Sequence, residues 1–247
     1  MVTRRELFTD SRPPVHPEVR RWASARASLA RMREIFEAEL RQLGDDLAAM
    51  SGMVERAITD AGQAVLTADL ALAQEVIAFD REIDEREREL DEQCVRLLAQ
   101  QAPVATDLRV VVTALRISSS LERMGDLARH LAQLARRSYP AHALPPTVTD
   151  TFTQMHDAAT RVARRTTALL ETRDLALATT VERDDDLLDL LHEQTFGALL
   201  SADWIGSVQE TIDVTLASRY YERFGDHAVS VARRIAYLVT GEPAELA

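Results

Sequence analysis

The chain has 247 residues, of which 46% are hydrophobic and 28% charged, with only 8 Gly and 8 Pro. Abundant Ala, Leu, Arg and Glu are strong helix formers, so the composition predicts an all-α fold. The formal net charge of -11 argues against a nucleic-acid-binding surface and favours cations or basic proteins as partners. No stretch reaches the 18 or so apolar residues of a membrane span. We expect a cytoplasmic protein that meets a membrane only through its partners.

The first 31 residues differ from the rest of the chain. Residues 1–31 hold seven Arg against three acidic residues. Pro13, Pro14 and Pro17 interrupt any early helix, because proline lacks a backbone N–H. We therefore predict a basic, disordered extension, with the folded part beginning at Met32.

Helical periodicity dominates the remainder of the chain. The predicted helices span residues 32–67, 69–101, 103–138, 150–173, 174–200 and 205–239. Asp69 and Asp174 stand where helices begin, and their carboxylates are predicted to accept hydrogen bonds from free backbone amides. Three prolines mark residues 139–149 as a linker. The linker separates two sets of three helices, residues 32–138 and 150–241, and each set can close a small bundle.

The two halves repeat the same residues in the same order. The pentapeptide DLALA at 69–73 recurs at 174–178, and ERMGD at 122–126 recurs as ERFGD at 222–226. A repeat about a hundred residues long predicts a duplicated helical module.

The third and sixth predicted helices each have one apolar face. On the third helix, apolar residues at spacings of three and four are Ala114, Ile117, Leu121, Met124, Ala128 and Leu131. On the sixth helix the stripe consists of Ala217, Tyr220, Phe224, Val231, Ile235 and Leu238. At about 100° per residue, Glu122, Asp126, Glu222 and Asp226 lie opposite these stripes. We expect these four acids to point away from the core.

A glycine lies between the two acids in each repeat, Gly125 in the first and Gly225 in the second. Glycine in a helix interior costs roughly 1 kcal/mol relative to alanine. We therefore expect a helix, a partner or a coordinated ion to approach the backbone closely at these positions.

Acids at four-residue spacing predict one metal site in each bundle. The candidate ligands are Asp80, Asp84, Glu122 and Asp126 in the first repeat and Asp185, Asp189, Glu222 and Asp226 in the second. Four carboxylates on two neighbouring helices would make an oxygen-only site. Such a site suits hard cations such as Fe, Mn, Mg or Ca, and suits Zn less without Cys or several His.

The alternative is that these acids belong to ordinary ion-paired helix faces. Three of them have an arginine within one turn, giving the pairs Asp84–Arg88, Asp126–Arg129 and Glu222–Arg219. Asp185 and Asp189 have no such neighbour. Like charges four residues apart repel one another unless a cation or a partner neutralises them.

Motifs for catalysis are missing from the sequence. A carboxylate-bridged di-iron enzyme needs Glu-x-x-His on two helices, and none of the six His follows a Glu by three positions. Without any lysine there is no Walker-type nucleotide loop, and no nucleophile has an evident base. We predict no enzymatic activity, no catalytic residue and no organic cofactor. Cys94, the only cysteine, is expected to be a small core residue.

Four segments of the chain together form a recognisable pattern. They are the Asp80-x-x-x-Asp84 pair, PVATDLR at 103–109, LERMGDLA at 121–128 and YERFGDHA at 221–228. This pattern resembles PhoU, a family of bacterial phosphate-signalling regulators. The resemblance implies two three-helix bundles related by a pseudo-twofold axis, with multinuclear metal clusters held by the acidic motifs. We expect iron, with Mn, Mg or Zn as alternatives.

The resemblance also implies a function. Such a protein would be a non-enzymatic, homodimeric adaptor between the ATPase of the phosphate ABC transporter and a sensor histidine kinase. It would keep the phosphate-starvation response off when phosphate is plentiful. A carboxylate-bridged metalloenzyme and a plain helical scaffold are the alternatives. The second repeat carries DWIG at 203–206 in place of the segment at 103–109, so the two sites need not be equivalent.

Overall fold

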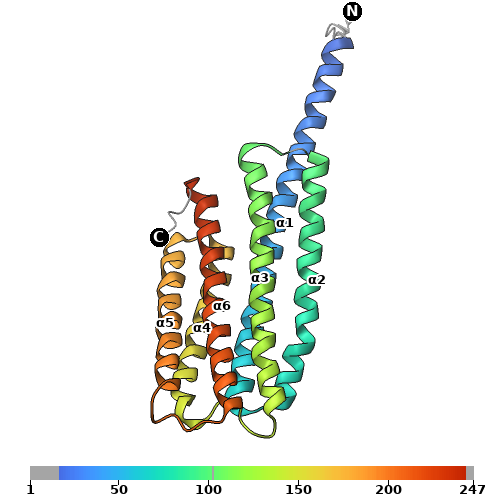
Figure 1. The fold of residues 1–247 in the computed structure, drawn as a ribbon. Helices are drawn as coiled ribbons and strands as arrows, with labels where there is room; N and C mark the ends of the chain where they lie inside the picture. Colours follow the sequence, from blue (N-terminus) through green and yellow to red (C-terminus); the bar gives the residue numbers. More distant parts are fainter. Residues whose placement is uncertain (1–16, 102, 243–247) are drawn as a thin grey trace, which may run out of the picture. The chain divides into compact units, whose positions relative to one another are not determined.

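A computed structural model describes residues 17–101 and 103–242 of the chain. They form α1 (Pro17–Thr67), α2 (Leu70–Gln101), α3 (Ala105–Ser138), α4 (Thr149–Thr172), α5 (Leu175–Leu199) and α6 (Val208–Thr240), as Figure 1 shows. A short 3-10 helix, η1 (Pro146–Val148), precedes α4. No strand occurs in the described ranges, and the predicted all-α class is confirmed.

All six predicted helices are present, and only the start of α1 lies far from its predicted position. Helix α1 begins at Pro17 rather than Met32, so residues 17–31 are helical where we expected a disordered extension. Pro17 does not interrupt the helix because it is the first helical residue, where a missing N–H loses no hydrogen bond. The rest of the predicted extension, residues 1–16, lies outside the described residues.

Local chemistry accounts for several helix ends. The side chains of Asp69 and Asp174 accept backbone amide hydrogen bonds of 3.0 Å at the starts of α2 and α5, as predicted. Helix α6 begins later than predicted because Ser207 and Glu210 form a capping box there. It ends at Gly241, whose φ of +76° is the left-handed conformation that glycine adopts without strain.

The chain divides into two compact units, residues 1–39 and 40–247. The first unit is described from Pro17 onward and consists of the N-terminal part of α1. The second unit contains the remainder of α1 together with α2–α6, and it carries both sequence repeats.

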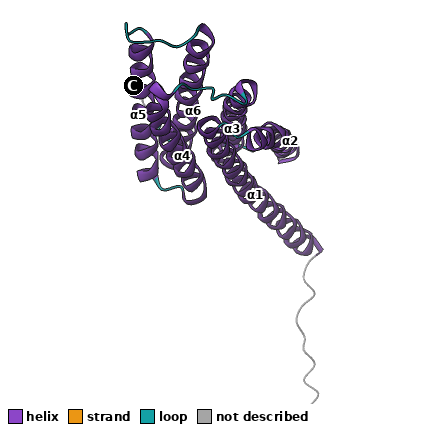
Figure 2. Cartoon of the chain, turned by 90° about the horizontal axis from the view of Figure 1, so that it is seen from below, coloured by secondary structure: helices purple, strands orange, loops and turns teal. Residues whose placement is uncertain are grey.

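Within the second unit, two three-helix bundles lie side by side. Helix α2 packs against α3 in the first bundle, and α4, α5 and α6 pack against one another in the second. The bundles meet along α3 and α6, and α1 meets α4 through a hydrogen bond of 3.0 Å between the hydroxyls of Ser51 and Thr167. Figures 1 and 2 show α2 and α5 on the outer sides of this arrangement.

Helices α3 and α6 run antiparallel along the junction of the bundles. Arg109, near the start of α3, lies over the ring of Tyr237, near the end of α6. Arg137, at the end of α3, forms an ion pair with Asp213, near the start of α6. An axis that exchanges the two helices therefore relates the bundles, which is the pseudo-twofold relationship that we expected.

The predicted apolar face of α3 forms the core of the first bundle. Its six residues are each at most 3% exposed. On α6 the structure differs at two positions, because Leu238 is only partly buried and Tyr221 rather than Tyr220 is buried, at 1% exposure. Tyr220 instead lies between the bundles, with its ring 5.2 Å from that of His130. Cys94 is fully buried as predicted, and burial raises the pKa of its thiol to about 12, so it is unreactive.

Candidate functional site

The first acidic cluster lies in the seam between α2 and α3. Asp80 is buried, at 6% exposure, and Asp84, Glu122 and Asp126 are half-buried. We expected Glu122 and Asp126 to point away from the core. They do lie opposite the core of α3, but α2 packs beside that face and encloses them.

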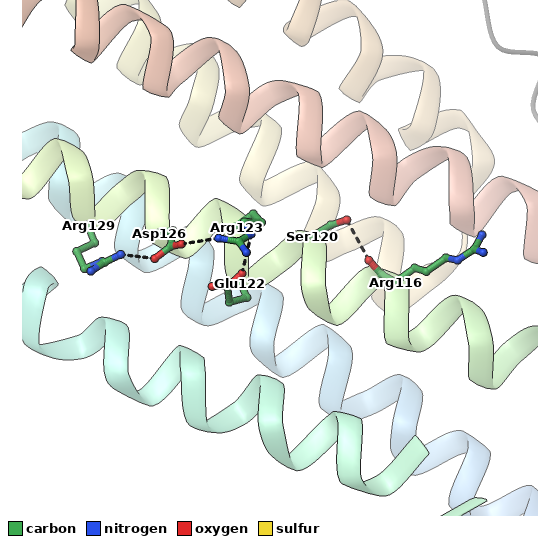
Figure 3. A network of polar contacts seen from close by, with 6 residues as sticks. All are labelled: Arg116, Ser120, Glu122, Arg123, Asp126 and Arg129. Atoms are coloured by element: carbon green, nitrogen blue, oxygen red, sulfur yellow. Dashed lines mark hydrogen bonds and ion pairs between the residues drawn. The ribbon is translucent and has the colours of Figure 1, made fainter. Parts of the chain in front are cut away.

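Arg129 is the central cation of the first cluster. Its Nε lies 2.9 Å from Oδ2 of Asp80, and its guanidinium also pairs with Asp126. Arg123 adds contacts of 3.2 Å to Asp126 and 3.3 Å to Glu122, as Figure 3 shows in part. Two helices are thus joined by ion pairs, and the first cluster is largely neutralised by the protein itself.

The ion pairs agree in part with the alternative reading of the acids. Asp126 pairs with Arg129 and Glu222 with Arg219, both as that reading expected. The third expected pair is not formed, because Arg88 binds Glu85 rather than Asp84.

Burial makes two carboxylates of the first cluster, those of Asp80 and Glu122, weaker acids. Burial raises the pKa of Asp80 to about 6 although Arg129 opposes the change, and the neighbouring acids Asp84 and Asp126 contribute further. Burial, followed by the charge of Asp126, raises the pKa of Glu122 to about 7. Both groups would hold a proton or a cation readily near neutral pH.

The second acidic cluster lies in the corresponding seam between α5 and α6. Burial raises the pKa of Asp185 to about 7, and the charges of Asp189 and Asp226 add to this effect. The pKa values of Asp189 and Glu222 are also raised, in each case first by burial and then by Asp226. Among the described residues, Arg219 is the one arginine that forms an ion pair with these four acids, and it pairs with Glu222.

The two clusters differ at one decisive position. Equivalent residues of α3 and α6 are 100 positions apart, as Glu122 and Glu222 are, so Val229 corresponds to Arg129. Val229 is buried, at 7% exposure. The second cluster therefore lacks the guanidinium that bridges Asp80 and Asp126 in the first. Its excess of negative charge is left for a proton or an external cation.

The glycines between the acids permit the close approach of a neighbouring helix. A Cβ at position 125 would lie 3.1 Å from two carbons of Ile83 on α2. A Cβ at position 225 would lie 2.0 Å from Oδ1 of Asp185 and 3.0 Å from Leu188 on α5. Of the three approaches that we considered, a helix is the one observed.

The donor set of the second cluster fits a hard cation. Oδ1 of Asp185 and Oε2 of Glu222 are buried and lack a hydrogen-bond partner among the described residues, and all four side chains offer only oxygen. Within these ranges, however, no three His, Cys, Asp or Glu side chains are already arranged around a metal position.

Of the two histidines near the second cluster, His192 is engaged with other side chains. Nδ1 of His192, which follows Asp189 by three residues, lies 3.0 Å from the hydroxyl of Ser218, and its ring packs on Phe196 at 4.8 Å. His227 is partly buried beside the junction of the bundles, and burial lowers its pKa.

Sequence reasoning singled out eight acids and the pair of Asp126 with Arg129, but it did not anticipate that Arg129 also binds Asp80. The contact between Arg129 and Asp80 joins two helices, so helical spacing gave no sign of it. An alignment of the two repeats could have shown the difference between the clusters, because it places Arg129 at the position of the apolar Val229.

Two similar three-helix bundles with paired acidic seams define a duplicated helical-bundle protein. None of the described helices is long and apolar enough to cross a membrane. The PhoU domain model matches residues 47–135 and 152–235, one match in each bundle. The chain belongs to the PhoU family.

Relatives match most of the chain. It is 40% identical over 210 residues to the phosphate-specific transport system accessory protein PhoU homolog 2 of Mycobacterium tuberculosis, a match that covers 85% of this chain and 99% of that protein. PhoU homolog 1 of Mycobacterium leprae is also 40% identical, with 95% of that protein covered.

Solved structures agree with the fold. The crystal structure of PhoU from Pseudomonas aeruginosa superposes with a TM-score of 0.79 at 31% identity, covering 84% of this chain and all of that one. The phosphate transport system regulatory protein PhoU from Streptococcus pneumoniae gives a TM-score of 0.74 at 23% identity, which supports the fold alone.

Proposed function

We propose that this protein is an accessory and regulatory protein of phosphate transport, and that it acts by binding other proteins rather than by catalysis. The observation that carries this proposal is the match of both bundles to the PhoU domain, at 40% identity to accessory proteins of phosphate-specific transport systems. The ion pairs are consistent with it, since Arg129 pairs with Asp80 and Asp126. The hydroxyl that contacts His192 belongs to Ser218, which is fully buried.

The finer form of the proposal is an adaptor role. The protein would connect the ATPase of the phosphate ABC transporter to a sensor histidine kinase, and would keep the starvation response off when phosphate is plentiful. We also propose that it works as a homodimer. Its net charge of -11 favours basic surfaces on these partners.

We further propose that metal ions, iron first and Mn, Mg or Zn as alternatives, bind the acidic clusters and support this role structurally. Asp185, Asp189, Glu222 and Asp226 would hold the cation in the second cluster. In the first cluster, Arg129 already supplies part of the positive charge. A bound cation would neutralise buried carboxylates and fix α5 against α6.

A carboxylate-bridged metalloenzyme is the second candidate function. It is less well supported, because the chain lacks Glu-x-x-His and because His192 interacts with Ser218. A plain helical scaffold would bind neither metal nor these partners.

Co-purification from phosphate-replete cells tests the adaptor role. The tagged wild-type protein should recover the transporter ATPase and a sensor kinase, and deletion of its gene should derepress phosphate-starvation genes in phosphate-rich medium. The double variant D189N/D226N, at two exposed positions of the second cluster, should recover less of these partners than the control E193Q on the exposed side of α5. Normal regulation in the deletion strain, and in a double deletion where a second copy exists, would contradict the adaptor role.

A further inference from the structure

A groove of about 860 Å³ runs between α3 and α6 at the end of the junction where α3 begins. Four arginines line it, Arg109 and Arg116 from α3 and Arg233 and Arg234 from α6. Such a concentration of positive charge is unexpected in a chain whose net charge is -11. Neither the acidic clusters nor the adaptor role accounts for it.

Three of these arginines lack an opposite charge. Among the described residues, no carboxylate lies within ion-pair distance of Arg109, Arg116 or Arg234. The Nε atoms of Arg109 and Arg234 are buried and have no hydrogen-bond partner there. Burial, and then the charge of Arg116, lowers the pKa of Arg234. The structure thus brings cations together and leaves their donors unused, which costs free energy unless an anion binds.

Arg109 has neutral neighbours that hold its side chain in place. Its guanidinium lies 5.2 Å from the centre of the Tyr237 ring, and it reaches the carboxyl end of α6 near Gly241. An aromatic face and the negative end of a helix dipole both attract a cation. Neither removes its charge, so Arg109 is positioned and still able to bind an anion.

The pseudo-twofold axis shows that the groove is not a by-product of the duplication. At the opposite end of the α3–α6 junction, the positions equivalent to the four arginines are Gln209, Leu216, Gln133 and Leu134. The arginine that does occur there, Arg137, is paired with Asp213. One end of the junction is therefore closed by an ion pair, and the other presents unpaired cations.

We propose that this groove binds a small molecule bearing a phosphate group, with the phosphate held by Arg109, Arg116 and Arg234. Guanidinium groups bind phosphate oxygens through paired, charge-assisted hydrogen bonds. A phosphate monoester carries a charge of about -1.5 to -2 near pH 7, which suits several unpaired guanidiniums better than one carboxylate does. This proposal is independent of the adaptor role.

Inorganic phosphate and a nucleotide share this chemistry. The groove is within the range of about 300–1,000 Å³ that is usual for sites of whole small molecules. Leu108, Val112 and Tyr237 supply apolar walls beside the arginines. Size and lining therefore favour a nucleotide over the free ion.

Acidic side chains confine the anion to one end of the groove. Asp185 and Asp226 line the other end and would repel it. Arg233 is paired with Glu182 at 3.2 Å, so it is not counted among the ligands. The phosphate site is thus distinct from the cation site of the second cluster, although the two share a groove.

Calorimetric titration of the full-length protein tests the proposal. The protein is kept in Tris chloride with EDTA and titrated separately with inorganic phosphate, AMP and ATP, with sodium chloride of equal ionic strength as the blank. At least one of the three phosphates should bind. A nucleotide that binds at least ten-fold more tightly than phosphate identifies an organic ligand, and equal or tighter binding of phosphate identifies the free ion.

Three single variants, R109Q, R116Q and R234Q, should each weaken that binding about ten-fold or more. R116Q is the variant least able to unfold the protein, because Arg116 is exposed. The control R96Q removes the same charge from an exposed position of α2 and should leave the affinity unchanged. The proposal is overturned if no phosphate binds, if R96Q weakens binding as much as R116Q does, or if binding requires a divalent cation in place of EDTA.

Discussion

Asp185 lies against the backbone of Gly225, so closely that a Cβ at position 225 would be 2.0 Å from its Oδ1. The equivalent Gly125 faces the side chain of Ile83 at 3.1 Å. The two equivalent glycines thus make room for different side chains, an aliphatic one beside Gly125 and a carboxylate beside Gly225.

Substituting the two glycines should have unequal effects. In G225A the added methyl group displaces Asp185, and we expect about 1–3 kcal/mol of lost stability from overpacking. In G125A the added methyl group would lie 3.1 Å from Ile83, so a shift of a few tenths of an ångström relieves the contact, and the better helix propensity of alanine offsets much of the cost. Urea denaturation of both variants measures this difference. Equal losses would contradict the role assigned to Asp185.

The residues at positions 129 and 229 should decide how strongly added metal ions stabilise each cluster. V229R places a guanidinium among the acids of α5 and α6 and should reduce the stabilisation that Mn²⁺ or Fe²⁺ confers. R129V removes the arginine side chain that neutralises the first cluster, and it should increase the stabilisation that the metal confers. For a single site that binds only the folded protein, saturation at a hundred-fold excess over Kd is worth about 2.7 kcal/mol.

The measurement is the shift in thermal stability on adding metal, taken within each variant so that any packing strain cancels. V229L serves as the control for the larger side chain. If V229R and V229L respond to metal alike, then the charge at position 229 does not decide cation binding.

The pH dependence of stability should depend on Asp185. Its pKa is raised from the usual 3.8 to about 7 in the folded protein, so between these values the folded state binds more protons than the unfolded state. The free energy of unfolding therefore falls as the pH rises from about 4 to about 7. Below that window both states are protonated and the effect vanishes.

The variant D185N carries no titrating group at this position. In EDTA, its stability relative to the wild type should improve from pH 5 to pH 8, as measured by urea denaturation. E193Q, on the exposed side of the same helix, is the control. A relative stability of D185N that is the same at both pH values would exclude this titration.

The ion pair that closes one end of the α3–α6 junction should contribute to stability. The Asp213 side chain is 3% exposed and accepts hydrogen bonds from Arg137 and, at 2.9 Å, from Gln209. We expect D213A to lower the free energy of unfolding by about 2 kcal/mol. The loss is not larger because the Arg137 side chain that remains is half exposed and can be hydrated. The exposed pair of Glu92 and Arg96 provides the comparison, and E92A should cost less than about 0.5 kcal/mol.

A double-mutant cycle with R137A separates the pair from other effects of the substitution. A coupling energy near zero would show that the two bundles are not held together at this point.

Much of the fold was predictable because its determinants are local. Helical periodicity located the buried face of α3, from Ala114 to Leu131, and the side chains of Asp69 and Asp174 cap the helices that follow them. Each of these effects depends on residues within a few turns of one helix. The duplication could likewise be recognised from the repeated motifs, and with it the family.

Only the tertiary structure decided how the charges are distributed. The sequence alone determined which acids are present and that they recur. It did not show that Arg129 bridges Asp80 and Asp126, or that Arg109 and Arg234 line one groove with unpartnered Nε atoms. The physical reason is that electrostatic interactions depend on separation in space and on burial, and both are set by which helices pack together. Residues more than a hundred positions apart become neighbours along α3 and α6, and no spacing along the chain records that distance.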